Sequence, residues 1–382
     1  MTGSGAPARR LRATAQLAWL LSRSTFSPGR RAARRQHTDY YRRLWAGAAA
    51  TAGVPVRDLG DGRLEIGVGA QRLEVRGTRC SIDDPATLDR AGDKVLVHRL
   101  LAERGVPMPT YEVFTLADLE PARRFLAAAP GACVVKPGVD GAVGRGVVTG
   151  LRRQADLAPA AVAAAAVGAR ASRRGRTGAL VTRLARMVTD VHRVSLLIEH
   201  QVPGENYRLL YLDGVLIDAI RRGSPTLAGD GRHRVGELVA RMNAERVKGG
   251  GGQRGQTLIS TDLDYERTVA AQGLTPDSVP ASGAVVRLKT TINESAPENS
   301  HPARDALCDA VIEQGALAAA TVGARWAGVD IITVDPGVPL QEAGGVVVEV
   351  NTTPGLSMHL HGRPGEVNPA VALLRGLAGH PR

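Results

Sequence analysis

Two apolar stretches near the C-terminus place the strongest constraint on how this chain can fold. They cover residues 326–335 and 345–355, are joined by a short loop, and are typical of neighbouring β-strands. Side chains two positions apart in a strand share a face, so Glu349 and Asn351 should point the same way, with Asp330 beside them on the other strand. Two carboxylates and an amide are oxygen ligands, and they predict a magnesium site at this place.

The same alternation predicts which side of the second strand is buried. Val348 and Val350 are expected in the core, on the face opposite Glu349 and Asn351. Taken alone, this Glu-Val-Asn sequence also fits a buried strand that merely ends in polar residues. The choice between the two interpretations depends on the rest of the chain.

A lysine followed by a glycine-rich loop occurs earlier in the chain. Residues 132–137 are typical of a short β-branched strand, which carries Lys136 and ends at a proline. Four glycines follow, where missing side chains let backbone N–H groups approach an anion: Gly138, Gly141, Gly144 and Gly146. The spacing is not that of a P-loop. On its own the cluster fits a phosphate-covering loop or, more commonly, a hairpin.

Two further segments carry charged residues in the order that a nucleotide site requires. Residues 93–103 predict a helix with an acidic first residue, and Lys94 in its first turn is disfavoured by the helix dipole, which is weak support for a phosphate-binding role. Residues 195–214 predict a buried strand with Glu199 near its end, a polar crossover, and a second strand with Arg208 that closes at an Asp-Gly turn. A nucleoside is expected across this crossover.

Together these positions resemble those of the ATP-grasp ligases. Residues 84–374 look most similar to the ATP-grasp module of cyanophycin synthetases. The stretches that carry this closer resemblance are 202–222, 228–239 and 346–360, with Asn243 and Arg246. The resemblance implies an α/β (α+β) ATP-grasp fold, in which two α+β subdomains clamp ATP, preceded by a basic helical N-terminal region.

The resemblance also implies roles for individual residues. Contacts with ATP would come from Lys94, Lys136, Gly141, Gly144, Arg145, Gly146, Glu199 and Glu205. Mg²⁺, expected as two ions with Mn²⁺ as a substitute, would be held by Asp330, Glu349 and Asn351. The catalytic residues would be Arg208, Lys289 and Asn293, the first two facing the transferred phosphoryl group and the acyl intermediate.

The implied reaction is the formation of an amide or peptide bond. ATP-grasp ligases transfer the γ-phosphoryl group of ATP to a carboxylate, and an amine then displaces phosphate; this requires mainly positioning and charge neutralisation. We therefore expect an ATP-dependent carboxylate–amine ligase acting on small-molecule carboxylate and amine substrates, such as an amino acid or small peptide. A phosphotransferase with the same fold is the alternative. An inactive nucleotide sensor is a third hypothesis, against which the complete set of phosphate and metal positions counts.

Three departures from the cyanophycin synthetase pattern concern the substrate side and the extent of the chain. The position in the crossover that is usually acidic is Asn206, so the ribose contact is expected from Glu205 or from this amide. Residues 293–299 lack the family's paired glycines and gain two carboxylates, which predicts a changed substrate. The Mur-ligase-like module is absent from this sequence, and we expect an enzyme other than a complete cyanophycin synthetase.

Composition favours a cytoplasmic enzyme. The chain has 382 residues and is 43% hydrophobic, enough for two or three subdomains with large cores. Its three cysteines show no metal-ligand spacing, and a reducing cytoplasm is expected. The net charge of +12 favours an anionic substrate, whereas only 3% aromatic residues argue against specific nucleic-acid binding.

Three regions are expected along the chain. Residues 1–53 are basic and helix-prone, and they are expected to pack on the core or to join subunits of a homo-oligomer; their longest apolar run is far below the ~18 residues that cross a bilayer. Residues 54–85 predict a short β-rich unit with turns at Asp61-Gly62 and at Gly69.

The third region, residues 86–378, is the predicted ATP-grasp module. A lid subdomain is expected at about 110–198, with a basic insertion at about 168–193. A solvated loop is the default interpretation of the insertion. The alternative is a lid that captures an acidic substrate.

Overall fold

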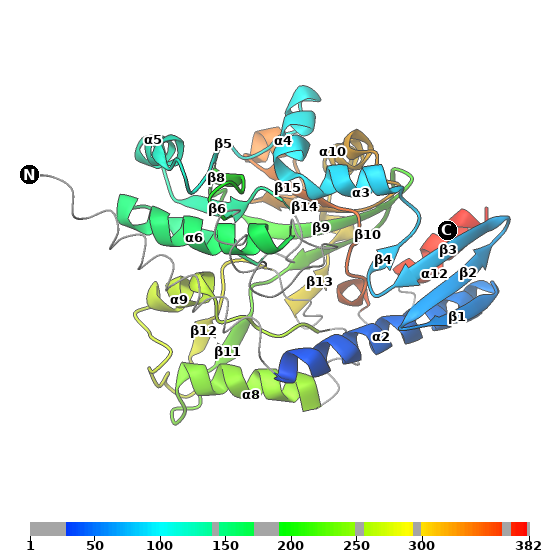
Figure 1. Cartoon of the computed structure of the whole chain (residues 1–382), viewed down its shortest axis with the longest axis horizontal. Helices are drawn as coiled ribbons and strands as arrows, with labels where there is room; N and C mark the ends of the chain where they lie inside the picture. The colour runs from blue at the N-terminus through cyan, green and yellow to red at the C-terminus, as the bar shows by residue number, and fades with distance from the viewer. Residues whose placement is uncertain are drawn as a thin grey trace, which may run out of the picture.

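The computed structural model describes residues 28–139, 145–171, 191–248, 256–292, 299–360 and 368–379. Four β-sheets lie within these ranges, and every strand pairing in them is antiparallel. Helices pack against the sheets, as Figure 1 shows. The predicted mixed α/β (α+β) fold class is confirmed.

A five-stranded sheet forms the centre of the molecule, with the order β13-β10-β9-β14-β15 (Figure 1). Its strands are β9 (Glu205–Leu212), β10 (Val215–Arg222), β13 (Ser300–Pro302), β14 (Trp326–Thr333) and β15 (Val346–Asn351). β9 and β10 form the predicted hairpin, and Asp213 and Gly214 at its turn have φ of 50° and 78°. Both residue types tolerate this left-handed conformation, which a tight hairpin requires.

Helices cover one face of the central sheet, and the N-terminal region covers part of the other. The first face packs against α3 (Pro85–Gly92), α4 (Lys94–Glu103), α10 (Asp309–Val322) and α11 (Leu340–Ala343). The second face packs against α2 (Pro28–Ala52) and α12 (Pro369–Leu377). The predicted helix at residues 93–103 is α4, and Asp93 caps it by accepting a hydrogen bond from the N–H of Leu96 at 3.0 Å.

One predicted burial is wrong because of a β-bulge in β15. Asp330 pairs with Glu349, but the next residue of β14, Ile331, pairs with Val347. Val348 is the extra residue of the bulge and is only partly buried, so the expectation that Val348 lies in the core is wrong. Val347 is 1% exposed and takes the expected place, and Val350 is 2% exposed as predicted. A bulge shifts the alternation of faces by one residue.

A four-stranded sheet with the order β5-β8-β6-β7 lies in the stretch that was predicted to be a lid, and we call it the lid sheet. Its strands are β5 (Tyr111–Phe114), β6 (Cys133–Pro137), β7 (Val148–Leu151) and β8 (Leu196–His200), covered by α5 (Glu120–Ala128) and α6 (Gln154–Ala171). The glycine-rich segment joins β6 to β7, which pair as a hairpin. Residues 140–144 of this segment, and most of the predicted insertion at 168–193, lie outside the described residues.

A small two-stranded unit lies below the lid in Figure 1. It contains β11 (Thr226–Ala228), β12 (Val285–Arg287), α8 (Val235–Lys248) and α9 (Leu263–Ala270). Two single turns of 3₁₀ helix, η3 (Arg304–Ala306) and η4 (Ser357–His359), lie against the central sheet.

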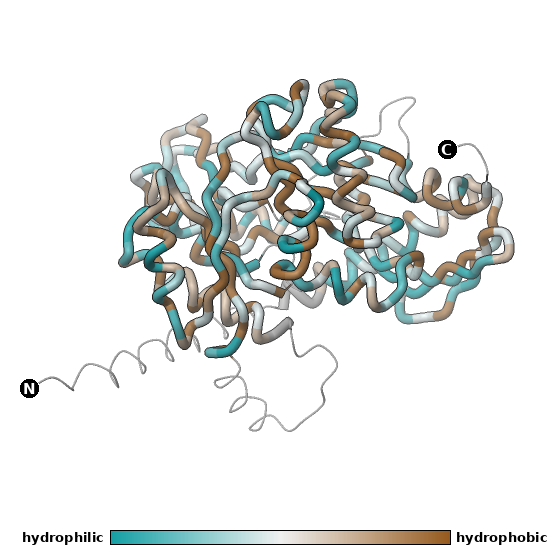
Figure 2. Tube along the Cα trace, turned by 90° about the horizontal axis from the view of Figure 1, so that it is seen from above, coloured by the Kyte–Doolittle hydropathy of each residue, from teal (hydrophilic) through white to brown (hydrophobic). Residues whose placement is uncertain are grey.

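The N-terminal sheet has the order β1-β2-β3-β4. It consists of β1 (Val56–Gly60), β2 (Arg63–Val68), β3 (Gln71–Arg76) and β4 (Arg79–Cys80). The predicted turns are present, with φ of 51° at Asp61, 74° at Gly62 and 58° at Gly69. Figure 2 shows this sheet at one end of the molecule, and hydrophobic segments through the centre. No described helix is long and apolar enough to cross a membrane.

Candidate active site

Helix α4 places two basic side chains between the central sheet and the lid sheet. Lys94 and His98 are four residues apart and therefore lie one above the other on the same side of the helix. Lys94 forms an ion pair with Glu349 of the central sheet. His98 Nε2 lies 2.6 Å from Glu199 Oε1 of the lid sheet. One helix thus joins both halves of the site.

Strand register brings three of the predicted site residues together on the central sheet. Asp330 of β14 is paired with Arg208 of β9 on one side and with Glu349 of β15 on the other. Arg208 forms a bidentate ion pair with Asp330: Nε donates to Oδ1, and Nη2 donates to Oδ2 at 2.7 Å. Arg222 of β10 approaches the same carboxylate at 3.4 Å. Asn351 follows two residues after Glu349, on the same face.

The carboxylate of Glu349 stays ionised although it is mostly enclosed. Burial alone would raise its pKa, but the Lys94 ammonium, with smaller contributions from Arg208 and the Asn351 amide, lowers the pKa below its ordinary value. The side chain keeps 28% of its surface exposed. An ionised, accessible carboxylate is what a metal ion or a cationic group requires.

On the lid sheet, Lys136 is buried against Glu199. Lys136 Nζ lies 2.6 Å from Glu199 Oε1, and the two side chains are 9% and 5% exposed. Burial acts to raise the pKa of Glu199, but Lys136 and His98 lower it below its ordinary value. Burial lowers the pKa of His98, so its imidazole is neutral near pH 7. A backbone hydrogen bond also joins the start of α4 to the end of β6, because the N–H of Lys94 donates to the carbonyl of Gly138 at 2.9 Å.

The structure does not place every predicted residue among these groups. Lys289 is fully buried in the small unit, where its Nζ donates to Asp262 Oδ2 at 2.7 Å and to Ser260 Oγ at 2.9 Å. Lys289 is linked to the site by the chain segment that follows it, in which the carbonyl of Ile292 accepts a hydrogen bond from Arg222 Nη2 at 2.7 Å.

Of the two candidates for the ribose contact, Asn206 shares the face of β9 with Arg208. Glu205 is on the opposite face by strand alternation, is 57% exposed, and lies 3.9 Å from Arg221. Arg145 and Gly146 precede β7, and Gly146, with φ of 79°, packs against α6. Gly141, Gly144 and Asn293 lie outside the described residues.

Two residues of the site were missed by sequence reasoning. His98 contacts both Lys136 and Glu199, and its spacing of four from Lys94 in a predicted helix was the available signal. Arg222 adds a second guanidinium at Asp330, and no local pattern marked it.

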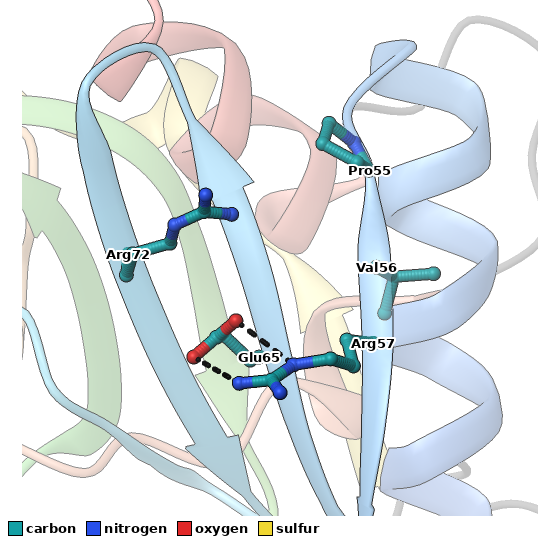
Figure 3. A pocket seen from close by; sticks show the side chains of 5 residues that line it. All are labelled: Pro55, Val56, Arg57, Glu65 and Arg72. Atoms are coloured by element: carbon teal, nitrogen blue, oxygen red, sulfur yellow. Dashed lines mark hydrogen bonds and ion pairs between the residues drawn. The ribbon is translucent and has the colours of Figure 1, made fainter.

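The site is distinct from a hollow on the N-terminal sheet. That hollow, of about 450 Å³, lies on the N-terminal sheet and is lined by Pro55, Val56, Arg57, Glu65 and Arg72 (Figure 3). Arg57 and Glu65 pair across it at 3.0 Å. A narrow crevice does open at the site itself, between α4 and β15, lined by Lys94, His98 and Glu349 among others.

Comparison with known proteins finds relatives over most of this chain. Cyanophycin synthetase from Nostoc sp. is 29% identical over 324 residues, which is 83% of this chain and 31% of the relative. The same enzyme from Synechocystis sp. is 28% identical over 307 residues, or 78% of this chain and 31% of the relative. The chain thus spans about a third of the length of these relatives. The predicted resemblance to cyanophycin synthetases is confirmed.

Other matches are shorter or more distant. A glutathione biosynthesis bifunctional protein from Streptococcus thermophilus is 30% identical over 169 residues, covering 44% of this chain and 22% of that protein. A solved bifunctional glutathione synthetase from Pasteurella multocida superimposes with a TM-score of 0.48 at 21% identity, covering 85% of this chain and 41% of that chain. No protein-family model matches the chain.

Proposed function

We propose that this relative of the ATP-grasp ligases uses ATP and Mg²⁺ to join a carboxylate to an amine through an acyl-phosphate intermediate. One observation carries the proposal: three ion pairs, Lys94–Glu349, Lys136–Glu199 and Arg208–Asp330, gather where the lid sheet, α4 and the central sheet meet. The similarity to proteins named as synthetases favours bond formation over simple phosphorylation.

In the proposed function, Lys94 and Lys136 can each pair either with a glutamate or with a phosphate of the nucleotide. Lys94 and Lys136 are each neutralised by a glutamate. A triphosphate competes with these carboxylates for the two ammonium groups, because charge-assisted hydrogen bonds to phosphate are strong. When Lys94 turns to a phosphate, the oxygens of Glu349 become available to a metal ion.

The donor set fits a magnesium ion that enters with ATP. Asp330, Glu349 and Asn351 provide oxygen atoms from two adjacent strands, and Mg²⁺ commonly uses one or two carboxylates plus substrate phosphates. Among the described residues, no three His, Cys, Asp or Glu side chains cluster closely enough to hold a metal alone. When bound, the ion would neutralise charge on the phosphates.

In the proposed reaction, a substrate carboxylate oxygen attacks the γ-phosphorus, the bond to the β–γ bridging oxygen breaks, and ADP leaves. The amine nitrogen then attacks the acyl carbon and gives up a proton as phosphate departs. Arg208 holds a fixed positive charge at this place, because its guanidinium is 7% exposed and locked onto Asp330. Such a preorganised cation stabilises charge that develops during transfer.

Trapping with hydroxylamine tests the proposed intermediate. With ATP, Mg²⁺, hydroxylamine and a panel of amino and dicarboxylic acids, the correct acid should give a coloured hydroxamate and release both ADP and phosphate. Hydroxylamine replaces the amine, so the natural acceptor need not be known. A stable phosphorylated product with no release of phosphate would instead identify the chain as a phosphotransferase.

Lys136→Ala should weaken nucleotide binding strongly. A charged hydrogen bond contributes about 1.5 to 3 kcal/mol, so the dissociation constant for a non-hydrolysable ATP analogue should rise about ten- to a hundredfold. Lys248→Ala is the matched control, because Lys248 is exposed at the end of α8. Titration calorimetry compares the two variants, and equal effects would remove Lys136 from the nucleotide site.

A further inference from the structure

The N-terminal helix α2 covers the face of the central sheet that carries Arg208. Leu210 and Leu212 lie two and four residues after Arg208 in β9 and therefore share its face. Both leucines belong to one buried apolar cluster with Tyr41 and Trp45 of α2. The polar site thus begins where the apolar contact with α2 ends.

Tyr41 presents a buried hydroxyl to the turn that follows Asn351. Its side chain is fully buried, and its hydroxyl oxygen accepts hydrogen bonds from the N–H groups of Leu356, at 2.9 Å, and Ser357, at 3.4 Å. Burial raises the pKa of Tyr41, so the phenol stays neutral, while the charge of Arg208 lies close enough to oppose that shift. A hydroxyl of the N-terminal helix therefore satisfies two backbone donors next to the site.

The turn and Arg208 both come close to Gly328. A β-carbon added at Gly328 of β14 would lie 2.9 Å from both Arg208 Cδ and Pro354 Cβ. Glycine at this position leaves room for both the arginine stem and the proline ring beside the same strand. At the far end of the turn, His359 Nδ1 lies 2.6 Å from Asp218 Oδ2 of β10. Residues 352–359, the post-Asn351 turn, are thus anchored at Tyr41, at Gly328 and at Asp218.

We propose that Tyr41 is a positioning residue of the ligase site. Its hydroxyl fixes the post-Asn351 turn, and this turn holds the Arg208 guanidinium in place through Pro354. The inference rests on the proposed function and extends the site beyond the predicted ATP-grasp module. It assigns α2 a role in the chemical step in addition to packing. ATP itself is bound by Lys94 and Lys136, so its affinity does not depend on Tyr41.

The test compares Tyr41→Phe with Tyr40→Phe. Both changes remove one oxygen, but Tyr40 is only partly buried and makes no hydrogen bond to the turn. Hydrogen exchange, read by mass spectrometry on the free protein, should be about tenfold faster in Tyr41→Phe for residues 352–360 and unchanged in Tyr40→Phe. In the hydroxamate assay, kcat should fall about tenfold in Tyr41→Phe with the KM for ATP unchanged.

The outcomes separate this inference from the proposed function. If the wild type gives hydroxamate but Tyr41→Phe shows wild-type kcat, or if exchange rises uniformly over the chain, Tyr41 only packs the helix and the inference is wrong. If the wild type gives no hydroxamate with any acid, the proposed function fails. Unchanged exchange at residues 352–360 would reject the role of Tyr41 even in that case.

Discussion

Replacing Glu349 with glutamine is expected to lower turnover by at least about 100-fold while the fold survives, a loss comparable with that of other transition-state contacts. Glutamine has nearly the same shape but no charge, so the site loses a proposed metal ligand and the charged partner of Lys94. Because both side chains keep some solvent access, the free energy of unfolding should fall by only about 1 to 2 kcal/mol. Hydroxamate formation and thermal melting measure the two effects.

Glu342→Gln is the control for this experiment. Glu342 lies on the exposed surface of α11, and the same chemical change there should leave both turnover and melting as in the wild type. Full activity of Glu349→Gln would show that Glu349 does not belong to the site.

The sequence predicted how the candidate residues of the central sheet are grouped, because that grouping depends on local periodicity. Alternation along β15 was enough to place Glu349 and Asn351 on one face, and two consecutive strands place Asp330 next to them. The bulge at Val348 was not predictable, because a bulge depends on how two strands pair and not on the residues of one strand. The bulge shifts the buried valine by one position and leaves Glu349 and Asn351 on the same face.

The pairs between elements could not be predicted for a different reason. Lys136 and Glu199 lie on neighbouring strands of the lid sheet, but β6 and β8 are separated by about 60 residues of chain that contain α6. Only the tertiary fold decides which buried carboxylate meets which cation. The contact of Tyr41 with Leu356 spans a still longer separation, 315 residues, and nothing in the N-terminal sequence indicated it.

The ion pairs also differ in how far stability depends on them. Lys94 and Glu349 are 14% and 28% exposed, whereas Arg208, Arg222 and Asp330 are each 7% exposed. A buried charge that loses its partner costs far more than an exposed one, since it can no longer be solvated. Glu349 and Asp330, both proposed as metal ligands, should therefore respond differently to the same kind of substitution.

Asp330→Asn is expected to destabilise the protein as well as inactivate it. The change leaves Arg208 and Arg222 buried beside a neutral amide, and removing one partner of a buried ion pair costs about 3 to 5 kcal/mol. Thermal melting should show a clear fall, in contrast to Glu349→Gln, and turnover should be lost because Arg208 is no longer fixed.

The matched control for the stability effect is Asp58→Asn. Asp58 pairs with Arg42 on the surface, where the two side chains are 43% and 46% exposed, so solvent replaces the lost contact and melting should not change measurably. If Asp330→Asn melts like Asp58→Asn, the two arginines do not depend on Asp330 for neutralisation. The carboxylate would then act only as a ligand, and its position between Arg208 and Glu349 would matter for chemistry alone.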